Sequence, residues 1–390
     1  MNSARFKTAS MAAFVAALAA MPMAAGTVAA ADLPITKAPP KTSDAGGSFW
    51  AEIDYLGWTV KGDRLPPMVT ASPAGTPLAQ AGVLGAPGTT VLFGDSAVNG
   101  GWRSGGRLQA GYWFDPRRGK GIEVSFFDLQ SASTRFATDS NAHPILAQPF
   151  FNALTNLQDA ALVGFPGLLT GTVAVSESSR LLGAGALYRQ EIGMWSGQRV
   201  SALIGYRYLH SSDKLSVPVA LDFGVGTLSD TDAFNATSNF HGVDLGLAGE
   251  WRQGPWTLEW RGKVALGANF NSASINGTTT VTAGGVATTS PGGLLALSSN
   301  IGNFSQTRFA AVPEISLKAG YQVAPQWQIV AGYDVLYWTG VQRAGGLIDT
   351  NINPNLIPPA TPGGPQRPMP VFNTSSLVAQ GFSVGVRYNY

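Results

Sequence analysis

Charged residues recur at every second or fourth position within segments of the chain that are otherwise apolar or small. The acidic members of this set are Glu52, Asp54, Glu123, Asp244, Glu250, Glu259, Glu314 and Asp334, and the basic members are Arg103, Arg107, Arg189, Arg207, Arg261, Lys263, Lys318 and Arg387. The two signs balance closely. Because a bare charge in a narrow, low-dielectric interior is costly, we expect opposite charges to pair across neighbouring strands. Such residues would either brace a wall with salt bridges or line a pore that selects solutes by charge.

Catalytic chemistry would need a nucleophile or an activated water beside a positioned histidine and carboxylate. His210 lies close to Asp213 in the sequence, and His241 lies close to Asp244. If the segments form the wall of a barrel, these pairs could converge at its rim and form a hydrolase. Any hydrophilic rim contains such groups, however. We therefore predict that the protein is not an enzyme.

Metal, cofactor and nucleic-acid sites have weak support in the sequence. The chain has no cysteine and only three histidines, which are too scattered to suggest a metal cluster. The pattern Gly183–Gly185 is not followed by a helical segment, so it does not predict a phosphate loop. A net charge of +2 is too small to indicate nucleic-acid binding. We predict no metal, no cofactor and no nucleic-acid partner.

The segments that carry these charges alternate in the manner of β-strands. At the C-terminus, every second residue is apolar, and small or polar residues fill the gaps, as in Phe382, Val384, Val386, Tyr388 and Tyr390. Successive side chains of a strand point to opposite faces, so one face here is apolar. Ten such segments are predicted, at residues 49–59, 102–114, 122–136, 172–190, 200–209, 240–251, 256–270, 309–321, 327–338 and 377–390.

The composition indicates that the apolar face of the strands contacts lipid and not a protein core. Hydrophobic residues make up 45% of the chain and charged residues only 12%, which is low for a soluble protein. No run after the N-terminus is long enough for a spanning helix. A sheet in a bilayer must close on itself, because an open edge would leave backbone groups without partners. The sequence predicts an all-β fold, a transmembrane antiparallel up-and-down β-barrel; a soluble sandwich is the alternative.

Connections between the segments alternate between short and long. Short turns are expected near residues 115–120, 193–198, 252–255 and 323–326, and long loops at 61–101, 138–171, 211–239, 271–306 and 341–375. Bacterial barrels have short periplasmic turns and long extracellular loops. About ten strands fit this order, and twelve are possible if a hairpin lies within the first or fourth loop.

The N-terminus has the layout of a secretory signal peptide. Arg5 and Lys7 precede a short apolar run, and Ala29, Ala30 and Ala31 end a stretch of small residues. We expect three parts: a signal peptide at 1–31, a disordered periplasmic tail at 32–47, and the barrel at 48–390. An exported barrel of this kind belongs in the outer membrane of a Gram-negative bacterium.

Aromatic residues recur near the ends of the predicted strands. Tyrosine and tryptophan suit the membrane–water interface, because their rings are apolar and carry a polar group. We expect this role for Tyr55, Trp58, Trp113, Trp195, Tyr208, Trp251, Trp256, Trp327, Tyr337 and Tyr388.

Several stretches resemble the putative beta-barrel porin family seven of bacterial outer membranes. They include KGDRLPPMVTASPAGTPLAQAGVLGAPGTTVLFGDS from Lys61, RSGGRLQAGYWFD from Arg103, GLAGEWRQGPWTLEWRGKVALG from Gly246 and IDTNINPNLIPP from Ile348. The resemblance runs in order from about Phe49 to Tyr390 and implies an outer-membrane barrel. It implies no established substrate or catalytic residues.

Two functions follow as expectations. The first is a porin-like passive diffusion channel for small solutes. The alternative is a closed structural or surface-recognition barrel, in which the loops at residues 62–67, 94–96 and 348–359 cap the mouth or bind a partner. Expected partners are outer-membrane lipid, lipopolysaccharide and the barrel assembly machinery, which would bind the strand ending at Tyr390.

Overall fold

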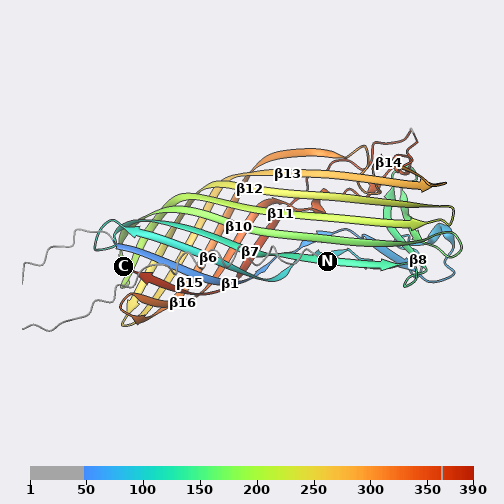
Figure 1. Cartoon of the computed structure of the whole chain (residues 1–390). Coiled ribbons are helices and arrows are strands. Elements are labelled where there is room, and N and C mark those ends of the chain that lie inside the picture. The colour runs from blue at the N-terminus through green and yellow to red at the C-terminus, as the bar shows by residue number, and fades with distance from the viewer. Residues whose placement is uncertain (1–47, 362) are drawn as a thin grey trace, which may run out of the picture. The chain divides into compact units, whose positions relative to one another are not determined.

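A computed structural model describes residues 48–361 and 363–390. The predicted signal peptide and periplasmic tail lie outside the described residues. Ten long antiparallel strands form the barrel (Figure 1). They are β1 (Ser48–Val60), β6 (Gly101–Trp113), β7 (Lys120–Asp139), β10 (Thr170–Trp195), β11 (Gln198–Asp222), β12 (Gly226–Gln253), β13 (Trp256–Ala283), β15 (Gly302–Ala324), β16 (Trp327–Gln342) and β18 (Thr374–Asn389).

The sheet closes because the first and last strands pair with each other. Trp50 of β1 lies opposite Asn389 of β18, and the pairing continues to Val60 and Ala379. On its other side, β18 pairs with β16, so the C-terminal strand has neighbours on both edges. The predicted all-β, closed antiparallel barrel of ten strands is confirmed. An eleventh strand, β14 (Val286–Pro291), pairs only with the far part of β13.

The outer surface of the barrel carries an apolar belt, because the outward side chains of all ten strands are large and hydrophobic. Ile53 is 49% exposed, Val124 54% and Val384 54%. The other seven strands contribute Tyr112, Tyr188, Ile204, Leu245, Leu266, Leu317 and Ile329. A continuous apolar surface of this kind is unusual on a soluble protein and suits contact with lipid.

Aromatic pairs border this belt at the end with the short turns, which we call the near end. Trp256 packs edge-on against Tyr321 with ring centroids 4.9 Å apart, and Trp327 lies 5.0 Å from Tyr388. Trp58 and Trp113, which the sequence placed with the interface aromatics, are instead buried on the inner face. The reason is parity, since they follow Asp54 and Gly111 at even spacings on the inward side of their strands.

At the opposite, distal end, β7, β10, β11, β12 and β13 continue beyond the belt and form an extended sheet (Figure 1). β7 stays paired with β10 as far as Asp139 and Thr172. The prediction of a long loop at residues 211–239 is wrong, since β11 and β12 pair there in unbroken register and only residues 223–225 connect them. Serine, threonine and asparagine dominate these stretches and resemble loop composition, but they alternate with buried apolar residues.

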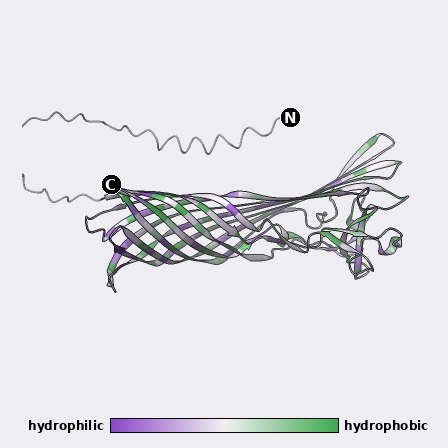
Figure 2. Cartoon of the chain, turned by 90° about the horizontal axis from the view of Figure 1, so that it is seen from below, coloured by the Kyte–Doolittle hydropathy of each residue, from purple (hydrophilic) through white to green (hydrophobic). Residues whose placement is uncertain are grey.

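Figure 2 shows hydrophobic and hydrophilic residues interspersed along these strands. The pattern of burial shows that the two faces exchange character at the edge of the belt. On β11, Ile204 faces outward and Arg207 inward within the belt, whereas Lys214 is exposed and Leu215 buried beyond it. On β13, the inward Arg261 and Lys263 give way to the buried Ala273 and Ile275. A strand with lipid outside needs an apolar outer face, and one with water outside needs an apolar inner face. The exchange therefore locates the boundary of the membrane.

The long connections fold against the inner face of this extended sheet and form a head with its own core. Their short elements are β2 (Asp63–Leu65), β3 (Val69–Ser72), η1 (Leu78–Gln80), β4 (Thr90–Phe93), β5 (Ser96–Val98), β8 (Ile145–Asn152), β9 (Leu157–Gly164), η2 (Gly345–Leu347), β17 (Asn351–Ile352) and η3 (Pro354–Leu356). Leu65, Leu146 and Leu347 from three connections join Val217 of β11 and Phe234 of β12 in this core. Among the described residues, no helix has the length and apolarity to cross a bilayer.

Candidate functional site in the barrel interior

The sixteen charged residues singled out in the sequence lie on the inner side of the wall. Twelve of them are less than 9% exposed, and Glu250, Arg261, Lys263 and Glu314 are half-buried. Period-two alternation positions them, because the belt fixes which face of each strand meets lipid. Their role as the lining of a pore remains a prediction.

One group of these charges joins strands from opposite ends of the sequence. The Lys318 ammonium on β15 donates to Glu52, to Asp54 at 3.1 Å and to Gln109 at 3.0 Å. The Arg387 guanidinium on β18 donates to Glu52 at 2.6 Å and also pairs with Glu259. Every cation therefore meets at least two acceptors.

The same group extends to β6 and β16. The Arg107 guanidinium donates to Asp54 at 2.8 Å and lies 3.1 Å from an oxygen of Asp334. Asp54 thus bridges Lys318 and Arg107. With its charges paired in this way, the interior at this level is braced across six strands.

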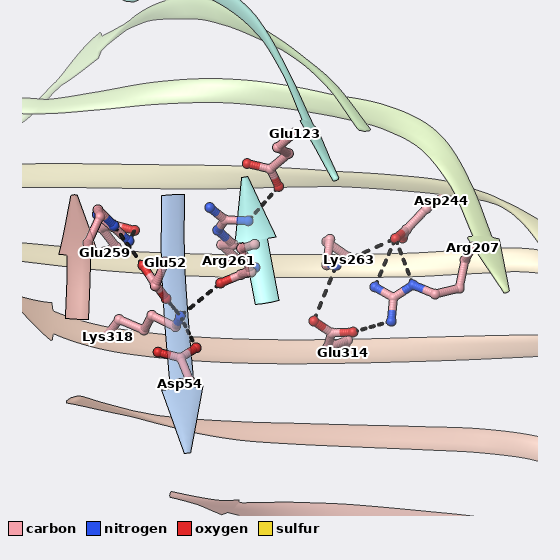
Figure 3. A network of polar contacts seen from close by, with 12 residues as sticks. Glu52, Asp54, Glu123, Arg207, Asp244, Glu259, Arg261, Lys263, Glu314 and Lys318 are labelled. Carbon is pink, nitrogen blue, oxygen red and sulfur yellow. Dashed lines mark hydrogen bonds and ion pairs between the residues drawn. The ribbon is translucent and has the colours of Figure 1, made fainter. Parts of the chain in front are cut away.

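A second group lies beside it (Figure 3). The Arg207 guanidinium on β11 pairs with Asp244 at 2.9 Å and with Glu314. The Lys263 ammonium lies 3.5 Å from Asp244 and 3.2 Å from Glu314. Two cations and two carboxylates therefore form a closed square. Arg261 and Glu123 make a separate pair at 2.5 Å.

Three of the sixteen stand apart from these groups. Arg189 stacks on the Trp113 ring, 5.1 Å from its centroid. Glu250 pairs with the half-exposed Arg252 at the near end. Arg103 lies at the distal mouth and donates to the backbone carbonyls of Asn99 at 2.7 Å and Ser179 at 3.3 Å.

Above the charges, on the distal side, apolar side chains cross the interior. We call this set the apolar layer; nine of the ten barrel strands contribute to it. Its members are Leu56, Trp58, Val60, Phe127, Leu129, Leu181, Leu209, Phe240, Ala265, Ala310, Val312, Leu336, Trp338, Val341, Leu377 and Ala379. The largest are fully buried, with Trp338, Phe240, Leu209 and Leu56 all at 0% exposure.

Close packing in the apolar layer depends on a glycine and on a satisfied indole. A Cβ atom on Gly183 would collide with the Phe127 ring and with Leu209, so only glycine leaves room for both. The Trp338 indole N–H donates to Asn269 at 2.8 Å. The Asn269 amide in turn donates to the backbone carbonyls of Thr339 and Gly340 at 2.8 and 2.9 Å. The Trp338 indole and the Asn269 amide are therefore both paired.

A third level lies between the apolar layer and the core of the head. There Asp63 of β2, Glu177 of β10 and Asp213 of β11 bring carboxylate oxygens within 4.8 Å of one another. Arg343, which follows β16, pairs with Asp213. Ser178 and Arg180, the neighbours of Glu177 on the outer face, are polar, and Arg180 pairs with the exposed Asp128, so this level lies beyond the belt.

Burial governs the ionisation of this third level. Loss of water, together with the charges of Asp63 and Asp213, raises the pKa of Glu177 to about 9. Burial also raises the pKa of Asp63, against the opposing charge of Arg343. Of the three carboxylates, only Asp213 is paired directly with a guanidinium, that of Arg343.

A match to a family model shows to which protein family this barrel belongs. The model for putative beta barrel porin-7 matches residues 50–390, which is nearly the whole described chain. The chain belongs to the putative beta barrel porin-7 family. It is an outer-membrane β-barrel protein, as the sequence resemblance implied.

Solved structures similar to this porin-7 family member include outer-membrane proteins. The outer membrane protease OmpT from Escherichia coli is 9% identical with a TM-score of 0.38, covering 88% of this chain and 97% of its own. OmpT of Vibrio cholerae is 9% identical, with a TM-score of 0.15 and coverage of 90% and 99%. An anion-selective porin from Comamonas acidovorans is 9% identical, with a TM-score of 0.16 and coverage of 88% and 99%. No curated protein matches the chain.

The histidine–aspartate pairs considered in the sequence do not converge in this porin-7 family member. His210 faces outward and bonds Asn239 at 2.8 Å, whereas Asp213 is buried on the inner face. His241 lies outside against Tyr206, and Asp244 lies inside with Arg207. A spacing of three residues puts the two members of each pair on opposite faces of a strand.

The third level was missed by reasoning from the sequence. Residues 213–219 were placed in a loop. Residues 173–179 were placed within a predicted strand, but the alternation of Val173, Val175, Glu177 and Ser179 was not followed inward. Continued parity along β10 was the signal that could have revealed Glu177. Nothing in the sequence pointed to the approach of Asp63 from a separate loop.

Proposed function

We propose that this porin-7 family member is a closed outer-membrane barrel that displays a rigid extracellular head for recognition at the cell surface. The observation that carries the proposal is the apolar layer. A passage for ions or small polar solutes needs continuous water, and fully buried Trp338, Phe240, Leu209 and Leu56 occupy the path that such water would take.

The ion-pair groups below the layer support the same function. About eight strands leave an interior just wide enough for side chains to fill, and ten strands add little to that width. The paired charges occupy this space and neutralise each other, as at Asp54 between Lys318 and Arg107. A selectivity lining would instead leave charges facing water.

The head offers features suited to binding. Two clefts of about 480 and 520 Å³ lie at the distal tips of β7, β10, β11 and β12. Apolar side chains stand exposed at neighbouring tips, with Leu168 50%, Phe223 41% and Val225 88% exposed. The loops at residues 62–67 and 348–359 contribute Leu65, Ile348 and Ile352 to the core beneath, which gives the tips a fixed base.

A passive diffusion channel for small solutes is the competing function, and the family description favours it. Osmotic swelling of proteoliposomes separates the two. We expect vesicles that contain the folded protein to swell in a small sugar no faster than empty vesicles, whereas a general porin in parallel vesicles makes them swell at once. Swelling that depends on the amount of folded protein would replace our proposal with the channel.

A further inference from the structure

The third level is a group of buried carboxylates whose charges are only partly compensated by the protein. Asp63, Glu177 and Asp213 are 4%, 1% and 0% exposed, and each comes from a different element. One oxygen of Asp63 accepts from the Gly345 N–H at 2.6 Å, and one oxygen of Asp213 accepts from Arg343. These bonds leave the remaining carboxylate oxygens to face one another.

Several of the remaining polar atoms have no partner in the protein. Neither carboxylate oxygen of Glu177 accepts a hydrogen bond, and the second oxygen of Asp213 accepts none. The Ser211 hydroxyl, 1% exposed and two residues from Asp213 on the same inner face of β11, also lacks a partner. Buried oxygens without donors are costly, so a group that accepts electron pairs from oxygen would relieve this cost.

The two nearby arginines do not supply that compensation in full. Arg343 meets Asp213 and the backbone carbonyl of Lys61 at 3.2 Å. Arg103 directs its hydrogen bonds to two other backbone carbonyls rather than to a carboxylate. Glu177 therefore remains without a direct cationic partner.

We propose that Asp63, Glu177 and Asp213 bind a hard divalent cation of the calcium class inside the mouth of the barrel. Calcium takes oxygen ligands at about 2.3–2.6 Å, and carboxylate oxygens within 4.8 Å of one another can share one such ion. Carboxylate and hydroxyl oxygens without nitrogen or sulfur ligands favour calcium or magnesium over transition metals. The absence of cysteine and the scarcity of histidine do not bear on a site of this kind.

Bound there, the ion would tie the head to the barrel. Asp63 belongs to β2 in the first long connection, whereas Glu177 and Asp213 belong to the wall strands β10 and β11. The ion would replace the missing partners and hold the loop against the wall. This inference does not depend on whether the barrel conducts, since the site lies on the distal side of the apolar layer.

The test uses full-length mature protein, refolded in detergent from inclusion bodies so that it carries no lipopolysaccharide, and stripped with a chelator. Isothermal titration calorimetry with calcium chloride should show one site per chain. The Kd should be at or below about 1 mM, the range of extracellular calcium modules. Calcium should also raise the Tm. The near-isosteric Glu177→Gln should remove both effects.

Asp128→Asn is the matched control, because Asp128 is an exposed carboxylate paired with Arg180 on the outer face. It should bind calcium as the unaltered protein does. If Glu177→Gln fails to fold, Asp63→Asn in the first long connection serves instead. Absence of calcium and magnesium binding to the unaltered protein, or equal binding by Glu177→Gln, would overturn the proposal and leave a protonated Glu177 as the occupant of the site.

Discussion

At the scale of single residues, the interior is organised by the cost of burying charge. Each cation of the two ion-pair groups meets two carboxylates, as Lys263 does with Asp244 and Glu314. Removing one member of a buried pair is far more damaging than the pair is stabilising, because the partner is left charged in a dry place.

Asp244→Asn tests this reading of the interior. The substitution leaves Arg207 and Lys263 with Glu314 as their remaining partner, so we expect a loss of about 3–5 kcal/mol in the free energy of unfolding. Urea unfolding in detergent, followed by tryptophan fluorescence, measures it. Asp128→Asn at the exposed pair should cost at most about 1 kcal/mol. Equal and small losses in both variants would show that the interior charges are solvated.

The sequence was sufficient to predict which charges share a face, because alternation along one strand requires no knowledge of its neighbours. It could not predict their partners. Lys318 and Glu52 are 266 residues apart, and their contact depends on the stagger at which the barrel closes. The same limit hid the meeting of Asp63 with Glu177.

At the scale of elements, the informative feature is a strand that exchanges its apolar face. Along β11, the outer Ile204 and the inner Arg207 belong to the membrane, and the outer Lys214 and inner Leu215 belong to the head. For β11, β12 and β13, reasoning from the sequence found the half within the belt and assigned the distal half to a loop. The apolar residues there are on the other parity, and serine and threonine are as common in loops as in solvated strands.

Neighbouring substitutions on β11 test the exchange. Leu215→Ala should destabilise the head by about 2–5 kcal/mol, because it empties space in a packed core. Lys214→Ala, one residue earlier on the exposed face, should have little effect. Limited proteolysis of the folded protein measures the difference. Only Leu215→Ala should speed cleavage of the distal hairpin, which the outer parts of β11 and β12 form. Equal cleavage rates would mean that the extended sheet lacks a packed inner face.

The pH dependence of the head follows from Asp230 near the tip of β12. Burial, and then the charge of Asp232, raises its pKa from 3.8 to about 8. Because the folded state holds the proton more tightly, the contribution of Asp230 to stability is full below its unfolded pKa and is lost as pH rises through the folded one. Proteolysis of the distal hairpin should therefore accelerate between about pH 4 and pH 8.

Asp230→Asn should flatten this profile and slow cleavage at the alkaline end. The amide cannot ionise, so the cost of a buried charge disappears. An unchanged profile in the variant would assign the pH dependence to another group.

At the scale of the whole molecule, the long strands pass from the barrel, where their outer face meets lipid, into the head, where their outer face meets water. The closed ten-strand sheet was predictable, because lipid forbids an open edge and the connections alternate in length. The apolar layer was not, because its members come from nine strands and become a layer only at the observed register. Leu56, Leu209 and Trp338 appear in the sequence as unrelated inward residues.

The most direct test of the central claim is single-channel recording in planar bilayers. The refolded protein should insert without discrete conductance steps, because the apolar layer interrupts the water path. The double variant Phe240→Ala with Trp338→Ala, which empties the middle of that layer, should produce steps. Steps from the unaltered protein, of the same size as those from the double variant, would contradict the closed barrel.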